Sequence, residues 1–201
     1  MSIFHYMPAA YEIQNNVIIM HRSLTELDHF VKQFLTVFNK HTHSLIVSGY
    51  VSISTGRTRG TEDVDILLPL VGQETFKKIF EDLIAGGFWC YQSNSASEAY
   101  EYLQDMASIR FARQGETFPN MECIPVTPKR IAKYYELNHP QRIKIEDFEF
   151  NIPPVEFEIL YKEIILGSKK DIEDARHLRV FFKEIISPER FNKYKPIIEQ
   201  G

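Results

Sequence analysis

Two aspartates, Asp63 and Asp65, alternate with the apolar residues Val64, Ile66 and Leu68 in a segment that has the period-two pattern of a strand. In a strand their carboxylates lie on one face, roughly 7 Å apart. Two like charges at that spacing repel each other and resist burial. A solvated strand end is the alternative for an isolated pair. A divalent cation would remove the conflict, since carboxylate oxygens are the ligands of Mg²⁺, and the pattern therefore predicts a site for Mg²⁺ or Mn²⁺.

A turn of small residues, Ser48-Gly49, precedes this strand and follows the short apolar strand expected at Leu45 to Val47. Gly49 would let the backbone approach a ligand closely. A short helix is expected to follow, through Ser54, and the amides at its start could hold phosphate oxygens together with the Ser48 hydroxyl. A phosphate cradle beside a metal pair is the arrangement that in-line displacement at phosphorus requires.

A loop bounded by Gly56 and Gly60 connects the turn to the aspartates and carries Arg57 and Arg59. The arginines could contact a triphosphate, or could simply neutralise the aspartates or cap the loop. Metal sites of this kind recruit a third carboxylate from a neighbouring strand, and Glu122 is the best-placed candidate, with a solvent-facing strand acid as the alternative.

The elements that must position these residues alternate between strand and helix up to about residue 150 and are helical after Pro154. We therefore expect an α/β core over residues 1–150 and a C-terminal helical region over 151–201 packed on it. Capping boxes are expected at Ser23 to Glu26 and at Ser95 to Glu98, and a helix start at Thr127-Pro128. The remaining expected elements are strands at Val17 to Met20, Phe88 to Gln92, Ile109 to Arg113, Met121 to Val126 and Arg142 to Ile152, and helices at 24–38, 74–85, 155–166 and 170–182, with a last one after Ser187-Pro188.

The bulk composition suits a soluble protein with a real core, since 44% of its 201 residues are hydrophobic. A net charge of −4 argues against coating by nucleic acid. Cys90 and Cys123 form neither a spaced metal pair nor a disulfide framework and are expected to be buried. The stretch Met1 to Ala10 lacks the layout of a signal peptide and no apolar run approaches membrane-spanning length, so we expect a cytoplasmic protein without a membrane partner.

The segment from Val47 to Leu68 resembles the signature of the DNA polymerase beta-like nucleotidyltransferase superfamily. Within it, the chain is most similar to the abortive-infection nucleotidyltransferase toxins and the minimal nucleotidyltransferases. The matching positions are Gly49, Gly56, Arg57, Arg59, Thr61, Asp63 and Asp65. A second match lies at Tyr161-Lys162 and Lys170 to Leu178, which resemble the helical lysine and the Lys-Asp-x-x-Asp helix of the family.

The resemblance implies a nucleotidyltransferase-type mixed β-sheet flanked by helices. It also implies Mg²⁺-dependent transfer of a nucleoside monophosphate from a nucleoside triphosphate, such as ATP, to an acceptor hydroxyl on tRNA, protein or a small molecule. A cognate antitoxin or a second copy of the chain would be its protein partners. The residues so implicated are Asp63, Asp65 and Glu122 in catalysis and metal binding, and Ser48, Gly49, Arg59, Thr61, Lys162, Asp171 and Asp174 in nucleotide binding.

Several features leave other interpretations open. Ser48 stands where the family has glycine, the bulky Tyr50 could narrow a phosphate pocket, and Glu122 replaces the commoner aspartate. A non-catalytic module that binds a nucleotide or a partner is therefore the main rival, and a metal-dependent phosphohydrolase or nuclease is a second. Asp171 and Asp174 could orient Lys162 or could only favour a helix start, and Lys162 could extend its stem along an apolar surface. The basic set Lys129, Arg130 and Lys133 could meet an acidic or RNA acceptor but is more simply a solvated helix face.

Overall fold

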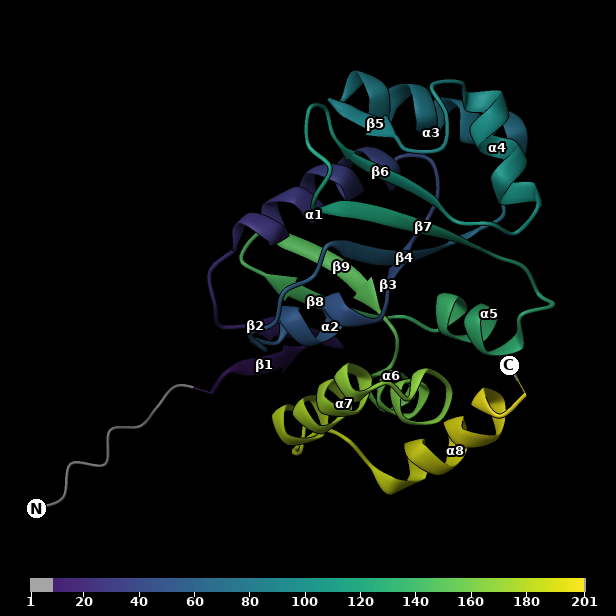
Figure 1. Ribbon diagram of the computed structural model, residues 1–201. Coiled ribbons are helices and arrows are strands. Elements are labelled where there is room, and N and C mark those ends of the chain that lie inside the picture. The colour runs from purple at the N-terminus through teal and green to yellow at the C-terminus, as the bar shows by residue number, and fades with distance from the viewer. Residues whose placement is uncertain (1–8, 201) are drawn as a thin grey trace, which may run out of the picture.

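The computed structural model describes residues 9–200 as two β-sheets surrounded by helices (Figure 1). Most of the Met1 to Ala10 stretch lies outside the described residues. The predicted α/β class, with helices flanking mixed sheets and a helical C-terminal region, is confirmed. The strands are β1 (Tyr11–Gln14), β2 (Val17–Met20), β3 (Leu45–Ile46), β4 (Asp63–Pro69), β5 (Phe88–Cys90), β6 (Ile109–Arg113), β7 (Asn120–Val126), β8 (Gln141–Ile145) and β9 (Phe148–Ile152).

The five-stranded sheet, in the order β3-β4-β7-β6-β5, carries the predicted acidic residues. Strands β4 and β7 run parallel, and the other neighbours are antiparallel. Val64 and Ile66 are fully buried under α1 (Glu26–Phe38) and α3 (Gln73–Ala85), where aromatic residues such as Phe34 and Phe76 complete the core. Because side chains alternate along β4, this burial directs Asp63 and Asp65 to the opposite face of the sheet.

The predicted capping boxes need correction. Helix α1 begins at Glu26 with Thr25 as its N-cap, and Thr25 and Asp28 form the reciprocal capping bonds in place of Ser23 and Glu26. Asp28 completes the cap because Arg22 and Tyr50 also bind its carboxylate and hold it in place. Both partners lie outside the four-residue capping pattern, so that pattern does not reveal them. Helix α4 (Ala96–Gln104) starts after Ser95 as expected, but the Ser95 side chain makes no capping bond.

The region between β7 and the C-terminal helices also differs from expectation. Helix α5 (Ile131–Asn138) begins at Ile131, because Thr127 and Pro128 form a turn closed by the Arg130 amide. The expected single strand from Arg142 to Ile152 is instead the antiparallel hairpin β8–β9, which turns at Glu146 and Asp147. Strand β8 pairs in parallel with β2, so this hairpin completes the four-stranded sheet β1-β2-β8-β9.

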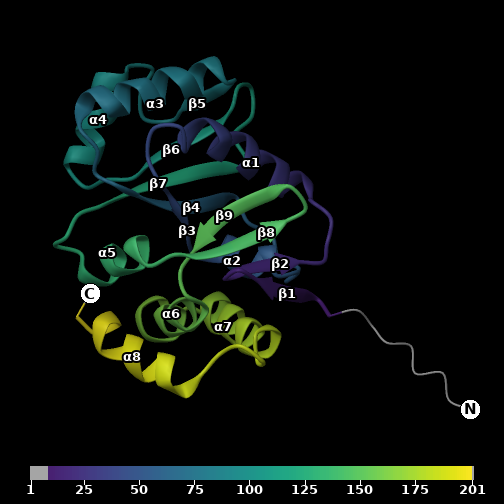
Figure 2. The ribbon, with the colours of Figure 1, turned by 180° about the vertical axis from the view of Figure 1, so that it is seen from behind.

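Four helical segments follow residue 154: α6 (Val155–Tyr161), the π-helix η1 (Lys162–Leu166), α7 (Lys169–Phe181) and α8 (Pro188–Ile198). Both views place α6, α7 and α8 on the side of the molecule opposite α3 and α4, with α5 beside α8 (Figures 1 and 2). Helix α7 also meets α2 (Gly49–Ser54), the short helix after the Ser48-Gly49 turn. Among residues 9–200, no helix combines the length and the apolar character needed to cross a bilayer.

Candidate metal centre and flanking cavities

Three carboxylates meet on the open face of the five-stranded sheet. Asp63 and Asp65 project from β4, and Glu122 lies directly opposite Asp65 on β7. One oxygen from each of the three lies within 4.8 Å of the others, and all three side chains are half-buried. Three hard oxygen donors at this spacing fit the coordination preference of Mg²⁺ or Mn²⁺. The structure thus brings together the acidic residues that the sequence predicts as metal ligands, which we term the acid trio.

The electrostatics of the acid trio favour a cation. The pKa of Asp65 is raised to about 6, first by burial and then by the neighbouring charges of Asp63 and Glu122. A hydrogen bond from the Ser48 side chain and the charge of Lys133 act in the opposite direction. The raised pKa shows that these two contacts do not offset the burial and the like charges around Asp65, a deficit that a bound cation would supply.

Glu122 has two partners that the sequence analysis did not identify. The Ser108 hydroxyl donates to Glu122 Oε1 at 2.6 Å, and the Arg110 guanidinium donates to Oε2 at 2.5 and 3.1 Å. Arg110 pairs with Glu122 across β6 and β7, so its side chain emerges on the same face as the acid trio. These bonds orient the Glu122 carboxylate and occupy both lone pairs of Oε2, so Oε1 retains one lone pair for a cation.

The Ser48-Gly49 turn has an unusual backbone. Ser48 has φ of 63° and ψ of −133°, which is a sparsely populated conformation for a residue with a Cβ. Gly49 does not supply the positive φ. A Cβ at this position would overlap the guanidinium of Arg59 where it lies in this structure. The group that closely approaches Gly49 is therefore the Arg59 side chain of the same protein.

Tyr50 does not narrow the space beside the turn. Its side chain is fully buried, its hydroxyl donates to Asp28 Oδ1 at 2.5 Å, and its ring packs near Phe150. Helix α2 thus directs Tyr50 into the core between the two sheets. The expectation that this bulky residue could restrict a phosphate pocket is wrong.

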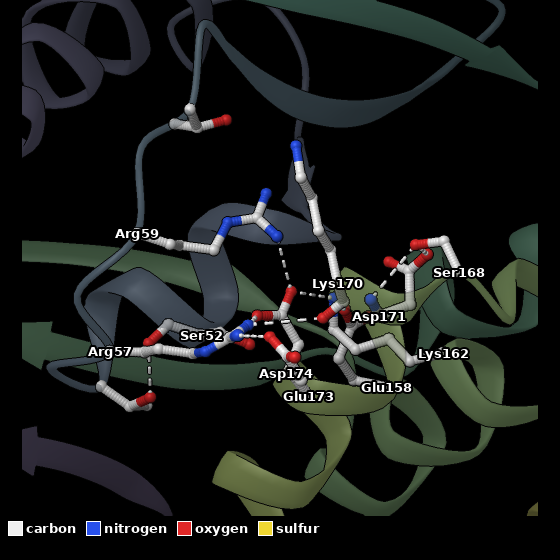
Figure 3. Close-up of polar contacts among 12 residues, drawn as sticks. Ser52, Arg57, Arg59, Glu158, Lys162, Ser168, Lys170, Asp171, Glu173 and Asp174 are labelled. Carbon is white, nitrogen blue, oxygen red and sulfur yellow. Dashed lines mark hydrogen bonds and ion pairs between the residues drawn. The ribbon is translucent and has the colours of Figure 1, made fainter.

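A buried ionic network connects the arginine loop to the C-terminal helices (Figure 3). Asp174 on α7 is fully buried and forms ion pairs with Arg57 and, at 3.0 Å, with Arg59. Lys162 is also fully buried, with its Nζ 3.2 Å from Asp174 Oδ2 and 3.2 Å from Glu158 Oε1. Of the two roles weighed for Asp174, contact with Lys162 is the one that the geometry displays.

Two other predicted nucleotide-binding residues have local partners. The Thr61 hydroxyl donates to the backbone oxygen of Asp63 at 2.7 Å and so supports the start of β4. Asp171 accepts a hydrogen bond from the Ser168 hydroxyl at 2.5 Å, and its own amide donates back to Ser168 Oγ at 3.3 Å. Asp171 therefore lies in the N-terminal cap of α7, as the alternative interpretation of this residue expected.

Two cavities flank the acid trio. The Asp63 cavity, of about 460 Å³, is lined by Arg59, Gly60, Thr61, Glu62, Asp63 and Lys170. The Asp65 cavity, of about 170 Å³, is lined by Val47, Ser48, Asp65, Ile124, Arg130, Lys133, Glu158, Tyr161 and Leu166. Each contains basic side chains beside one of the two aspartates. Two separate ligand groups could therefore reach the acid trio from different sides.

Lys133 has a buried environment that the sequence did not reveal. Only 15% of its side chain is exposed, its Nζ lies 2.9 Å from Glu136 Oε1, and it also lies 3.8 Å from the centre of the Tyr161 ring. The interpretation of Lys133 as part of a solvated basic face is therefore wrong, although Lys129 and Arg130 are exposed. Glu136 is completely buried, and burial raises its pKa to about 7.

Comparisons with known proteins identify no family. No family model and no curated protein sequence matches the chain. Among solved structures, the crystal structure of ANT(2")-Ia in complex with adenylyl-2"-tobramycin is similar in outline. The match has 12% sequence identity and a TM-score of 0.48, and it covers 87% of this chain and 98% of that one. Similarity at this level assigns no activity to the chain.

Proposed function

We propose that this chain is a divalent-metal-dependent nucleotidyltransferase that moves a nucleoside monophosphate from a nucleoside triphosphate to an acceptor hydroxyl. The observation that carries the proposal is the convergence of Asp63, Asp65 and Glu122 between two cavities with basic walls. Transfer of a nucleoside monophosphate needs a metal site flanked by cations that can bind the phosphate groups of the triphosphate. The order of Ser48-Gly49, the arginine loop and the aspartates, which resembles the nucleotidyltransferase signature, supports the same reaction class.

The acid trio would hold the cation. Bound Mg²⁺ or Mn²⁺ would neutralise charge on the reacting phosphate and lower the pKa of the acceptor hydroxyl. Asp63 and Asp65 would position the reacting phosphate, with Thr61 supporting the start of β4. Glu122, aligned by Ser108 and Arg110, would lie beside the acceptor and assist removal of its proton. The α-phosphorus would then gain a bond to the acceptor oxygen and lose its bond to pyrophosphate.

The arginine loop would bind the triphosphate. Arg59 lines the Asp63 cavity together with Lys170, and its guanidinium passes over Gly49. Asp174 holds Arg59 in this position through an ion pair, and Arg57 pairs with the same carboxylate. Pre-oriented guanidinium groups stabilise charge that develops on phosphate oxygens during transfer.

The decisive experiment is an incubation of the protein with each of the four radiolabelled triphosphates, Mg²⁺ and a cell extract. We expect label on one macromolecule or metabolite, release of pyrophosphate, and loss of both with Asp63→Asn or Asp65→Asn. The exposed Asp105 provides a matched control, so Asp105→Asn should transfer label normally. Melting temperatures of all variants should confirm that they fold.

The same incubation separates the rival functions. Binding of a triphosphate without release of pyrophosphate would identify a nucleotide-binding module. Release of free phosphate, or cleavage of nucleic acid without a labelled acceptor, would identify a hydrolase or nuclease. Undiminished transfer by Asp63→Asn and Asp65→Asn would reject the acid trio as the active centre.

A further inference from the structure

The lysine that the sequence pattern assigns to the phosphates does not reach either cavity. Lys162 has no exposed surface, and the carboxylates of Glu158 and Asp174 both lie 3.2 Å from its Nζ. It lines neither the Asp63 cavity nor the Asp65 cavity. Contact between Lys162 and a phosphate would require the breaking of a buried ionic network. This is costly because the buried Glu158 would lose the counter-charge of Lys162, and Asp174 would keep only its two arginines.

Lys133 is the only lysine in the wall of the Asp65 cavity, as the described residues define it. Ser48 and Asp65 belong to the same wall, so this cation shares one space with the small-residue turn and with a member of the acid trio. Lys133 arrives there from α5, an element separate from the two sequence blocks that resemble the nucleotidyltransferases. A scan of those two blocks alone cannot find it.

The surroundings of Lys133 keep it charged and hold it in place. Burial by itself lowers the pKa of Lys133, but the charges of Glu136, Tyr161 and Glu158 and the hydrogen bond to Glu136 raise it above the usual value. The ring of Tyr161 lies under the ammonium group at 3.8 Å, and Glu136 binds it from within the protein. The ammonium group thus has two fixed supports and retains a third donor for a ligand.

The composition of the cavity wall indicates an anionic ligand. Asp65 and Glu158 contribute negative charge, whereas Arg130 and Lys133 contribute positive charge. Once the acid trio holds a divalent cation, the charge on Asp65 is offset and the basic side chains remain to attract an anion. The volume of about 170 Å³ suits phosphate groups.

We propose that Lys133, assisted by Arg130, contacts phosphate oxygens of the bound triphosphate and of the departing pyrophosphate beside Ser48 and Asp65. Lys133 thereby takes the role that the sequence pattern assigns to Lys162, and Lys162 serves as the counter-charge of Glu158 and Asp174. This assignment rests on the proposed nucleotidyltransferase function. It distributes the phosphate-binding cations over both sides of the acid trio, with Arg59 and Lys170 on one side and Lys133 and Arg130 on the other.

Calorimetric titration with pyrophosphate and with ATP, each in the presence of Mg²⁺, tests the assignment directly. Lys133→Met should weaken the binding of both ligands by about tenfold or more, which is the loss expected for one charge-assisted hydrogen bond. Lys133→Arg should recover part of that affinity. Lys129→Met, which removes an exposed lysine from the preceding turn, should bind both ligands like the unaltered protein.

Loss of Lys133 leaves the buried Glu136 without its partner and could lower the stability of the single variant. The double variant Lys133→Met/Glu136→Gln therefore separates an effect on binding from an effect on stability. It removes both charges and should melt close to the unaltered protein while still binding weakly. Unchanged affinity in Lys133→Met or in this double variant overturns the assignment of Lys133 alone. Failure of the unaltered protein to bind pyrophosphate and all four triphosphates overturns the proposed function together with this assignment.

Discussion

Glu122 lies directly opposite Asp65 in the parallel register of β4 and β7, so two strands that are far apart in sequence contribute carboxylates to one point. Side chains opposite each other in neighbouring strands emerge on the same face of a sheet. The residues that precede them in each strand, Val64 on β4 and Met121 on β7, are buried on the other face. The position of the acid trio therefore follows from strand register. A shift of one residue in that register would place Glu122 on the opposite face from Asp65.

The first prediction concerns the partner of Glu122. Arg110→Met removes two hydrogen bonds that orient the Glu122 carboxylate. Outer partners of metal ligands commonly contribute about 10–100-fold to affinity, so we expect Mn²⁺ binding, measured by electron paramagnetic resonance, to weaken by about tenfold or more. Arg113→Met, on the same strand, is the control because Arg113 contacts Gln33 and Phe30 instead. Unchanged Mn²⁺ affinity in Arg110→Met would show that Glu122 needs no such support.

The second prediction concerns Gly49. An alanine there places a Cβ against the Arg59 guanidinium, which must move away from Asp174. Arg59 is flexible, so the fold should be retained while kcat/KM for the triphosphate falls by about tenfold to a hundredfold, as displacement of a positioning group typically produces. Gly72→Ala is the matched control, since Gly72 lines neither cavity and an added Cβ there meets no atom within 4 Å. Equal rates for the two variants would contradict the role given to Arg59.

The third prediction concerns the buried network. Lys162→Met leaves Glu158 and Asp174 without one of their counter-charges in a site that excludes water. Removal of one partner from a buried ion pair costs about 3–5 kcal/mol in free energy of unfolding. Urea denaturation should detect this loss, whereas Lys77→Met, at an exposed pair with Glu81, should change the free energy by less than about 1 kcal/mol. A variant as stable as the unaltered protein would refute the structural role of Lys162.

The fourth prediction concerns acid stability. Burial raises the pKa of Asp28, but hydrogen bonds from Arg22, Tyr50 and Thr25 outweigh it and lower the pKa from 3.8 to about 2. A carboxyl group whose pKa is depressed on folding contributes stability above its unfolded pKa and loses that contribution as pH falls through the folded value. Asp28 should thus contribute about 2 kcal/mol above pH 4, and this contribution should vanish towards pH 2.

Chemical denaturation of the unaltered protein and of Asp28→Asn at several pH values would measure that contribution. The difference in free energy of unfolding between the two proteins should be constant near neutral pH and should shrink between about pH 4 and pH 2. A difference that does not vary over this range would mean that Asp28 has the same pKa in the folded and unfolded chains.

Several features could be read from the sequence because they depend on local patterns. Alternation along residues 63–68 placed Asp63 and Asp65 on one face, and the apolar run before Ser48 located the turn. The same local rules failed where distant residues compete. Asp28, and not Glu26, completes the cap of α1 because Arg22 and Tyr50 bind its carboxylate. The strand expected at Arg142 to Ile152 divides because its first half pairs with β2.

The sequence by itself thus determined the acidic pair, the turn beside it and the α/β class, since each depends on residues within one element. Only the tertiary structure decided which charges meet. It buried Lys162 between Glu158 and Asp174, turned Lys133 into the Asp65 cavity and joined Arg110 to Glu122. The physical reason is that the cost of burying a charge depends on counter-charges that the fold brings from other segments, and spacing within one segment carries no information about them.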